Sequence, residues 1–247
     1  MKEWESNDGN TELYNGDCLE VMDKLIEEGV KIDLIVTSPP YNIKDFHANQ
    51  IKYSNYEGNS MTEETYQKWQ IEVLNRCYDL LEDGGSIMYN HKVRIKKGEM
   101  IHPLEWLFKT KFILKQEITW WQKKGANVDK CRFFPFSERI YWLTKSPKTK
   151  MINVDKIQDV IEFVPTHKRK DTGHPAVMPF EIAEMLIKPF GDKIKILDPF
   201  MGVASTGVAC KNLKMKFIGI ELDEGYFDIG VERIKNNSKW NQNFTRN

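Results

Sequence analysis

The sequence predicts an α/β fold in which a mostly parallel, twisted sheet carries helices on both faces. Three observations predict it. Short apolar stretches of strand length alternate along the chain with amphipathic stretches of helical period. The stretch at 32–36 is apolar almost throughout, as in a strand covered on both faces. The chain has 247 residues, of which 40% are hydrophobic, so it can bury the core of a single domain.

The first third of the chain opens this alternation. We expect a strand at 13–15 and then a helix over 19–27, whose apolar residues share one stripe. A second strand follows at 32–36. The polar segment 43–60 is expected to be a functional loop, because it is longer than a simple connection needs to be. Thr62 is then expected to cap a long helix, which has acidic residues in its first turn.

The central and C-terminal parts continue the alternation. The expected strands lie at 86–89, 112–121, 138–144, 194–197 and 217–220. The expected helices begin at Pro103 and Pro179 and span 205–212 and 225–235. Residues 1–247 are therefore predicted to form a single domain. Two less regular segments interrupt it, at 122–136 and at 145–173.

Charge is unevenly distributed along this domain. The net charge is +0, yet residues 91–170 hold 19 Lys and Arg against 8 Asp and Glu, which leaves 17 against 28 elsewhere. Aromatic residues are interleaved with these basic ones, a mixture that favours a nucleic-acid partner over a plain solvated face. Chance clustering of surface lysines is the alternative. The candidate phosphate or base contacts are Lys123, Lys124, Lys130, Arg132, Lys168, Arg169 and Lys170.

A stiff turn follows the strand predicted at 32–36. Consecutive prolines, Pro39 and Pro40, can continue neither a helix nor a central strand. The turn therefore presents the Ser38 hydroxyl, fixed carbonyls and the Tyr41 ring at the carboxyl end of a strand, where ligands bind in open α/β sheets. It is suited to hold a planar polar group. The alternative is a rigid strand exit with Tyr41 packed on the core.

A second informative loop follows the strand predicted at 194–197. Small residues such as Gly202 and Ser205 would let a ligand approach the backbone closely. The loop has neither the GxGxxG pattern nor a P-loop lysine, so a pyrophosphate is not indicated. Asp198 ends this strand, and Glu221 ends the next one at the position that grips ribose hydroxyls in nucleotide-binding folds. Together they indicate an adenosine-type ligand without phosphates, although each alone could be a helix cap.

These two motifs carry a resemblance to a known family. The pattern Asp-Pro-Phe-x-Gly-x-x-Ser-Thr-Gly from Asp198, with Ser-Pro-Pro-Tyr from Ser38, resembles the S-adenosylmethionine-dependent DNA amino-methyltransferases. The catalytic motif precedes the cofactor motif, as in their circularly permuted beta group, and the resemblance spans nearly the whole chain. It implies a Rossmann-like methyltransferase fold, S-adenosyl-L-methionine as cofactor, no metal, and double-stranded DNA as partner. Segment 145–173 would be a small target-recognition insert, with 122–136 as a further DNA-facing loop.

The resemblance also implies which residues hold the cofactor. They are Asp17, Cys18, Thr37, His174, Pro175, Asp198, Pro199, Phe200, Gly202, Ser205, Thr206, Glu221 and Leu222. Asp17 would lie by the adenine, His174 and Pro175 by the methionine moiety, and Glu221 on the ribose. Val203-Ala204 departs from the family, which often has a second glycine here, and is expected to tighten the loop.

The implied chemistry is methyl transfer to an exocyclic amine of a base flipped out of the duplex. The catalytic residues would be Ser38, Pro39, Pro40 and Tyr41. The Ser38 hydroxyl and the Pro39 carbonyl would accept the two amino hydrogens, and the proline rings would hold these acceptors rigid. Tyr41 would stack on the base, and Asn42 would contact DNA. Methylation at carbon 5 of cytosine needs a Pro-Cys nucleophile, which this sequence lacks.

The target base and the biological setting stay open at this point. In the family, Ser before Pro-Pro-Tyr goes mainly with cytosine N4 and Asp with adenine N6, so Ser38 favours cytosine over adenine. An RNA base methyltransferase and a non-catalytic nucleic-acid-binding module are the further alternatives. A restriction-modification or phage/host DNA-marking role is expected, with a separate restriction endonuclease as candidate partner. The protein is expected to lie in the cytoplasm, because no secretory signal, membrane span or CxxC pair occurs. It is expected to be a monomer or a homodimer.

Overall fold

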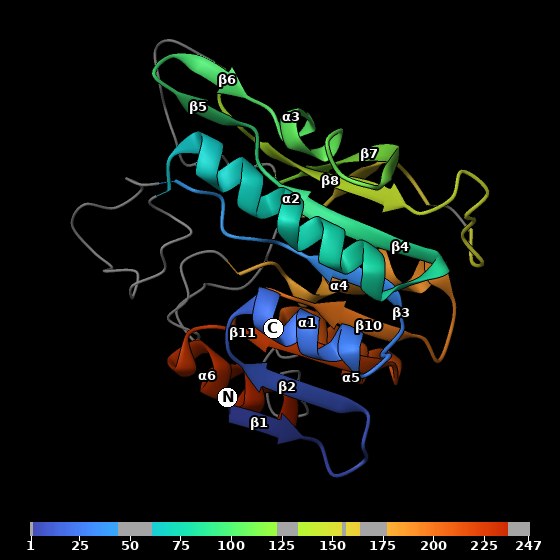
Figure 1. Ribbon diagram of the computed structural model, residues 1–247. Coiled ribbons are helices and arrows are strands. Elements are labelled where there is room, and N and C mark those ends of the chain that lie inside the picture. The colour runs from blue at the N-terminus through green and yellow to red at the C-terminus, as the bar shows by residue number, and fades with distance from the viewer. Residues whose placement is uncertain (1, 44–60, 123–132, 155–156, 164–176, 237–247) are drawn as a thin grey trace, which may run out of the picture.

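One twisted sheet organises the molecule (Figure 1). The computed structural model describes residues 2–43, 61–122, 133–154, 157–163 and 177–236, and within these the strands follow the order β1-β2-β11-β10-β3-β4-β8-β7-β9. The strands are β1 Lys2–Glu5, β2 Thr11–Asn15, β3 Ile32–Thr37, β4 Leu81–His91, β7 Ile113–Trp121, β8 Ser137–Thr144, β9 Val160–Glu162, β10 Lys195–Asp198 and β11 Lys216–Glu221. A separate hairpin pairs β5 Arg94–Lys96 with β6 Glu99–Ile101.

The centre of the sheet is parallel. Strands β2, β11, β10, β3 and β4 all run the same way, while β1 and β8 pair antiparallel to their inner neighbours. The outer strand β7 is antiparallel to β8 and parallel to β9. This confirms the predicted mostly parallel sheet, with antiparallel pairing added on both sides of its centre.

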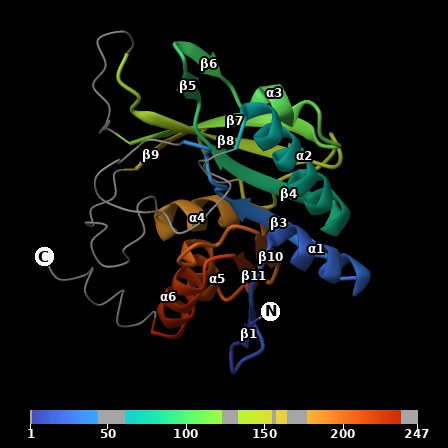
Figure 2. The same ribbon diagram turned by 60° about the vertical axis from the view of Figure 1, so that its left-hand side comes forward.

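Helices cover both faces of the sheet. They are α1 Cys18–Glu27, α2 Glu63–Leu80, α3 Leu104–Leu107, α4 Phe180–Ile187, α5 Ser205–Leu213 and α6 Glu224–Lys235, with a 3-10 turn at Lys188–Phe190. The first three lie on the face turned to the viewer in Figure 1, and α4, α5 and α6 lie on the other, as Figure 2 shows from the side. Two buried clusters fill the space, one under each layer of helices.

The neighbouring strands β3 and β10 form a topological switch point. After β3 the chain passes through α2 to β4 on one side, and after β10 it passes through α5 to β11 on the other. Connections that diverge in this way leave a space at the carboxyl ends of the two strands, which is where open α/β sheets bind ligands. The turn after Thr37 and the loop after Asp198 both begin at this point.

The structure adds elements that the sequence did not predict. Strand β1 and the β5–β6 hairpin are short and rich in charged residues, and β9 lies within the segment 145–173. They form because a neighbouring strand offers backbone partners, for which charged side chains are no obstacle at an edge. Thr62 does cap α2, since its side chain accepts a hydrogen bond from the Thr65 amide.

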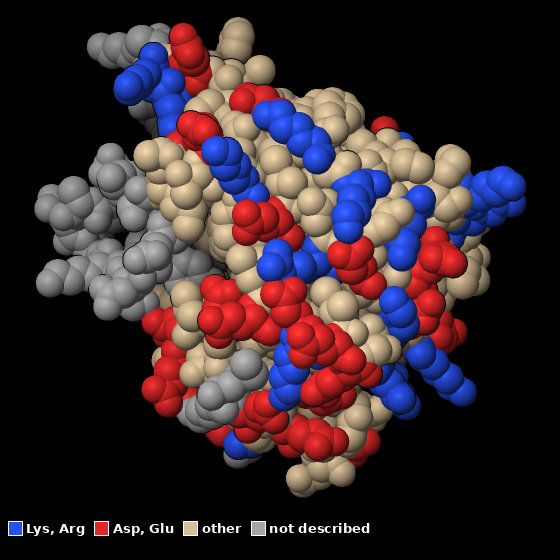
Figure 3. All heavy atoms as spheres, in the orientation of Figure 1, with Lys and Arg blue, Asp and Glu red and all other residues tan. Residues whose placement is uncertain are grey.

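Surface charge differs between the two halves of the visible face (Figure 3). Acidic side chains gather over the lower half, where α1, β1 and β2 lie, and Lys and Arg spread over the upper half. Acidic side chains thus predominate in the lower half of this face, with some Lys and Arg among them. No helix in the described part of the chain is long and apolar enough to cross a membrane.

Candidate active site

The turn after β3 is held by contacts on both sides. Asn42 closes it in a left-handed conformation with φ of +52°, which asparagine tolerates better than most residues. The Asn42 amide donates to the Met61 carbonyl at 3.1 Å, and its side chain is 1% exposed. Asn42, which we expected to contact DNA, is therefore buried here and links the turn to the start of α2.

A polar network surrounds the two hydroxyls of the turn. Ser38 Oγ lies 2.8 Å from the Tyr41 hydroxyl, which donates to Glu138 Oε2 at 3.2 Å. The Asn90 amide at the end of β4 lies 2.9 Å from the Tyr41 hydroxyl, 3.0 Å from Glu138 Oε2 and 3.4 Å from Ser38 Oγ. Lys92 pairs with the other Glu138 oxygen at 2.9 Å. The turn after β3 thus shares hydrogen bonds with β4 and β8.

The two proline carbonyls of the turn have different surroundings. The Tyr66 hydroxyl of α2 lies 2.8 Å from the Pro40 carbonyl and 2.7 Å from His91 Nε2, so these two acceptors share its single proton. Burial lowers the pKa of His91 to about 3, so its ring is neutral and Nδ1 donates to the Lys92 carbonyl. Within the described residues, no group donates to the Pro39 carbonyl. Within that part of the chain, the Pro39 carbonyl is therefore an acceptor without a competing donor.

The ring of Tyr41 has a protein neighbour as well. Its centroid lies 4.6 Å from that of His91, with the planes tilted by 44°. Burial, together with the charge of Glu138, raises the pKa of Tyr41 well above its usual value, so the side chain stays a neutral phenol. The position is compatible with a base lying against the ring, and stacking stays a prediction.

Asp198 joins the two motifs. Its Oδ1 accepts from the Thr37 hydroxyl at 2.8 Å and from the Phe200 amide at 3.1 Å, and its Oδ2 accepts from the Thr206 hydroxyl at 2.7 Å. The carboxyl is 4% exposed, and burial raises its pKa to about 6 against those hydrogen bonds. A buried anion with no cationic partner among the described residues suits a cationic ligand.

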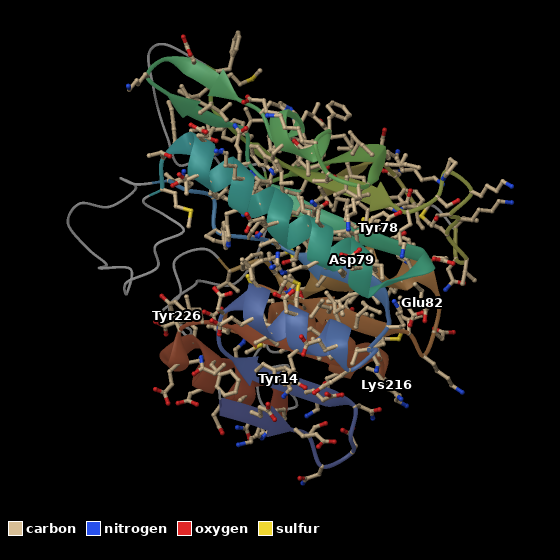
Figure 4. All side chains as sticks on the ribbon, viewed as in Figure 1. Tyr14, Tyr78, Asp79, Glu82, Lys216 and Tyr226 are labelled. Carbon is tan, nitrogen blue, oxygen red and sulfur yellow. The ribbon has the colours of Figure 1, made fainter. Side chains whose placement is uncertain are left out.

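Glu221 ends β11 beside the same loop. Its two oxygens accept from the backbone amides of Gly202 at 2.9 Å and Asp223 at 2.8 Å. Burial raises the pKa of Glu221 to about 7. Tyr226 of α6 lies at this edge of the sheet, at the left in Figure 4. The carboxyl group thus holds the loop after β10 and the start of α6 together at the position where the sequence predicts the ribose.

The loop between Asp198 and α5 has two left-handed residues. Gly202 has φ of +53° and Ala204 has φ of +60°. A left-handed conformation costs a non-glycine residue about 1 kcal/mol, so Ala204 takes the conformation that the family's glycine would adopt freely. Arg233 of α6 supports the loop from below, because its guanidinium donates to the Val203 carbonyl and lies 3.4 Å from Ser205 Oγ.

The remaining residues that were predicted to contact the cofactor or DNA fall into three groups. Asp17 caps α1 by accepting from the amides of Leu19 and Glu20, and the thiol of Cys18 is buried beneath it. Phe200 packs edge-on against Trp69 of α2 with centroids 5.5 Å apart, and Leu222 is 46% exposed. His174, Pro175, Lys123, Lys124, Lys130, Arg132, Lys168, Arg169 and Lys170 lie outside the described residues.

Sequence reasoning missed Glu138, Asn90 and His91. All three are polar and nearly buried, at 8%, 2% and 0% exposure. A signal existed for Asn90 and His91, because they follow the apolar run of β4 at its carboxyl end, at the edge where the turn was expected. Glu138 gave no such signal, since it opens an antiparallel strand whose pairing the sequence does not reveal.

An adenosine-type site without phosphates, placed beside rigid acceptors for an amino group, defines a methyltransferase of the S-adenosylmethionine-dependent class. The comparison with known families agrees. The model of a DNA methylase family, named for its N6 and N4 methyltransferases, matches residues 32–232. The chain belongs to this DNA methylase family and is an S-adenosylmethionine-dependent DNA amino-methyltransferase.

Individual relatives cover most of the chain. The type II methyltransferase M.BglII of Bacillus subtilis is 28% identical over 94% of this chain and 71% of its own length. M.ScaI of Streptomyces caespitosus is 28% identical over 90% of this chain and 81% of its own. Among solved structures, the cytosine-N4-specific PvuII DNA methyltransferase covers 91% of this chain and 86% of its own, with a TM-score of 0.73 at 19% identity. The M1.HpyAVI-SAM complex covers 91% of this chain and 98% of its own, with a TM-score of 0.68 at 22% identity. These two structures confirm the fold.

Proposed function

We propose that this protein methylates N4 of cytosine in double-stranded DNA, using Ser38 Oγ and the Pro39 carbonyl to accept the two amino hydrogens. Support comes from the turn itself. The Pro40 carbonyl is occupied by Tyr66, whereas the Pro39 carbonyl has no donor within the described residues. Ser38 stands one residue earlier on the same stiff backbone. Two acceptors are thus fixed in place before any base arrives.

The two acceptors would raise the nucleophilicity of the target amino group. The lone pair of an exocyclic amine is delocalised into the ring, so the nitrogen is a poor nucleophile. Hydrogen bonds from both amino hydrogens to Ser38 and Pro39 favour a tetrahedral nitrogen whose lone pair is localised. Because the proline rings hold the acceptors, little reorganisation accompanies the reaction. The sheet edge adds proximity by bringing this turn beside the cofactor loop.

The residues at the switch point fit the cofactor. S-adenosylmethionine supplies an activated methyl group on a sulfonium. Asp198 offers a buried anion for the cationic amino acid portion, and its neighbours Thr37 and Thr206 orient it. Glu221 has lone pairs left for ribose hydroxyls after accepting two backbone amides. Asp198, Glu221 and the loop from Phe200 to Thr206 are therefore the groups that would hold the cofactor.

The choice of cytosine rests on Ser38. A serine before Pro-Pro-Tyr goes mainly with cytosine N4 in the family that the sequence resembles, and adenine N6 is the second candidate. The test is to methylate a plasmid with the purified protein, digest it to nucleosides and identify the product by mass spectrometry. We expect N4-methylcytosine. N6-methyladenine would overturn the choice of base and leave the amino chemistry standing, whereas no methylated nucleoside would overturn both.

We further propose the setting in which this reaction occurs. Several relatives carry the name type II methyltransferase. This supports a restriction-modification or phage/host marking role in the cytoplasm, with a separate endonuclease that cleaves the same site. The segments 145–173 and 122–136 would read the target sequence. Such short segments suit a short target or a homodimer. Resistance of the methylated plasmid to a panel of restriction enzymes would identify the site.

A further inference from the structure

A chain of hydrogen bonds leads from Glu138 to the catalytic turn. Among the described residues, every polar group bound to the Glu138 carboxylate is a donor: the Tyr41 hydroxyl, the Asn90 amide and the Lys92 ammonium. The Tyr41 oxygen in turn lies 2.8 Å from Ser38 Oγ. Glu138 is thus the acceptor-only end of a chain whose other end is a group proposed to touch the base.

The direction of this chain follows from its end. An ionised carboxylate can only accept, so the single proton of Tyr41 points to Glu138. The Tyr41 oxygen then accepts from the Asn90 amide and from the Ser38 hydroxyl. Because the Ser38 proton is directed at Tyr41, one lone pair of Ser38 Oγ remains available beside the long hydrogen bond of 3.4 Å from the Asn90 amide. The turn therefore presents an acceptor, which is what an amino group requires.

We propose that Glu138 is a positioning residue that sets the direction of this hydrogen-bond chain and so makes Ser38 Oγ an acceptor for the target amino group. Without the carboxylate, the nearer partner for the Tyr41 proton is Ser38 Oγ, at 2.8 Å. Ser38 would then turn its own proton toward the base, and two donors would face each other. The inference rests on the role proposed above for Ser38.

Asn90 responds to the same carboxylate. Its Nδ2 faces Glu138, Tyr41 and Ser38, while its buried Oδ1 has no hydrogen-bond partner in the described structure. A buried amide oxygen without a hydrogen-bond partner is unfavourable, so this orientation of the Asn90 amide needs a compensating interaction. The charge of Glu138 accounts for this orientation, since it attracts the amide hydrogens.

The first test is Glu138→Gln, which keeps the shape of the side chain. The glutamine amide must direct its NH₂ group either at Tyr41 and Asn90 or at the Lys92 ammonium, and each choice sets donor against donor. We expect kcat to fall about 10- to 100-fold, while KM for DNA and Kd for S-adenosylmethionine change less than about twofold. Glu117→Gln is the matched control. Glu117 lies on the neighbouring strand β7, pairs with Arg139 and takes no part in the hydrogen-bond chain from Glu138 to Ser38. This substitution should leave all three constants unchanged.

The second test separates positioning from other roles. Tyr41→Phe keeps the ring and removes the hydroxyl through which Glu138 acts, so Glu138→Gln should have no further effect in that background. Full additivity of the two changes in kcat would overturn the inference, as would a Glu138→Gln protein with the kcat of the wild type. Ser38→Ala tests the underlying proposal by itself. An unchanged rate there would overturn the role of Ser38, whereas a slow Ser38→Ala beside a fast Glu138→Gln would overturn only the role of Glu138.

Discussion

Asp198 affects protein stability and is also the residue proposed to hold the cationic part of the cofactor. Its ordinary pKa of 3.8 rises to about 6, because burial outweighs its hydrogen bonds to Thr37, Thr206 and the Phe200 amide. When folding raises the pKa of a carboxyl group, the neutral carboxyl stabilises the folded protein relative to the ionised one. Its contribution to stability is therefore present below pH 4 and is lost as the pH rises through 6. A cation beside it would favour the ionised form instead.

Asp198→Asn should separate these two effects. The asparagine can keep its oxygen on Thr37 and the Phe200 amide and donate to the Thr206 hydroxyl. At pH 8 we expect its free energy of unfolding to exceed that of the wild type by about 1–3 kcal/mol, since two pKa units correspond to about 3 kcal/mol. The difference should vanish near pH 4. Urea unfolding across this range measures it, and a difference independent of pH would contradict the assignment.

The same substitution should weaken the cofactor site. Calorimetry should show that Asp198→Asn binds S-adenosylmethionine at least about tenfold more weakly, because a charge-assisted contact is lost. In the wild type, the affinity should rise with pH until Asp198 is ionised, near pH 6 to 7. An affinity that stays level across this range would show that the cofactor does not depend on the charge of Asp198.

Substitution of Tyr41 should affect mainly kcat, whereas substitution of Glu221 should affect mainly cofactor binding. We expect Tyr41→Ala to lower kcat about 100-fold with little change in cofactor affinity, because its hydroxyl orders Ser38 and Glu138. Glu221→Ala should instead raise the cofactor Kd about 10- to 100-fold, since it loses the contact to ribose and frees the amides of Gly202 and Asp223. Steady-state kinetics and calorimetry on both variants measure this, and equal losses of cofactor affinity would refute the division.

For single residues, the sequence reveals those that belong to a motif. It does not reveal residues from distant segments that contact the motif in the folded protein. Asp198 and Glu221 could be found because each ends an apolar strand before a small-residue loop. Glu138 could not, because its position beside Tyr41 depends on the antiparallel pairing of β4 with β8, in which Asn90 faces Ile140 and His91 faces Arg139. No local pattern encodes which strands become neighbours.

Among the elements, α5 packs closely against both α6 and the sheet. A Cβ added at Gly207 would lie 2.7 Å from side-chain atoms of both Ile234 on α6 and Phe217 on β11. The helix therefore lies directly on the sheet. Its first turn holds Ser205 and Thr206, so the closeness of this packing places the cofactor loop.

Gly207→Ala should test this placement. Alanine in a helix normally gains about 1 kcal/mol over glycine, but overpacking costs about 1–3 kcal/mol. We expect a net loss of about 1 kcal/mol in the free energy of unfolding and weaker binding of S-adenosylmethionine. Gly84→Ala is the control, because nothing lies within 4 Å of its added Cβ and its φ is not positive. A Gly207→Ala protein as stable as the wild type, with unchanged affinity, would contradict close packing.

The predicted and the missed elements differ in what holds them. Helix α1 was expected from its apolar stripe and α2 from its cap at Thr62, and both bury their apolar residues in one cluster. The strands β1, β5, β6 and β9 have three or four residues and little apolar periodicity. Backbone pairing alone forms them, and a sequence pattern cannot report it.

For the whole molecule, the separation of charge predicts how DNA binds. The basic residues at 91–170 should release counterions from the duplex, so the DNA affinity should fall steeply with salt while the cofactor affinity should not. Replacing Lys168, Arg169 and Lys170 together by glutamine should reduce the slope of log K against log salt by about 3, since each phosphate contact contributes about 0.9. Fluorescence anisotropy on a methylatable duplex at several salt concentrations measures this slope.

The matched control replaces three lysines at the amino ends of central strands. Lys31, Lys195 and Lys216 stand at the amino ends of β3, β10 and β11, and Lys216 appears at the right in Figure 4, away from the site. Their triple replacement by glutamine removes the same charge and should leave the slope unchanged. An equal fall in slope for both triples would show that DNA responds to net charge alone and would refute a localised contact.

The hydrogen bond from Thr37 to Asp198 joins residues 161 positions apart, and it has a consequence for the time at which the protein becomes active. On the ribosome, β2 and β3 emerge early, but their neighbours β11 and β10 belong to the last quarter of the chain. The centre of the sheet therefore cannot close until translation is almost complete. An unfinished chain carries the turn after β3 without its support from Asp198, so we expect methylation to begin only with a nearly full-length protein.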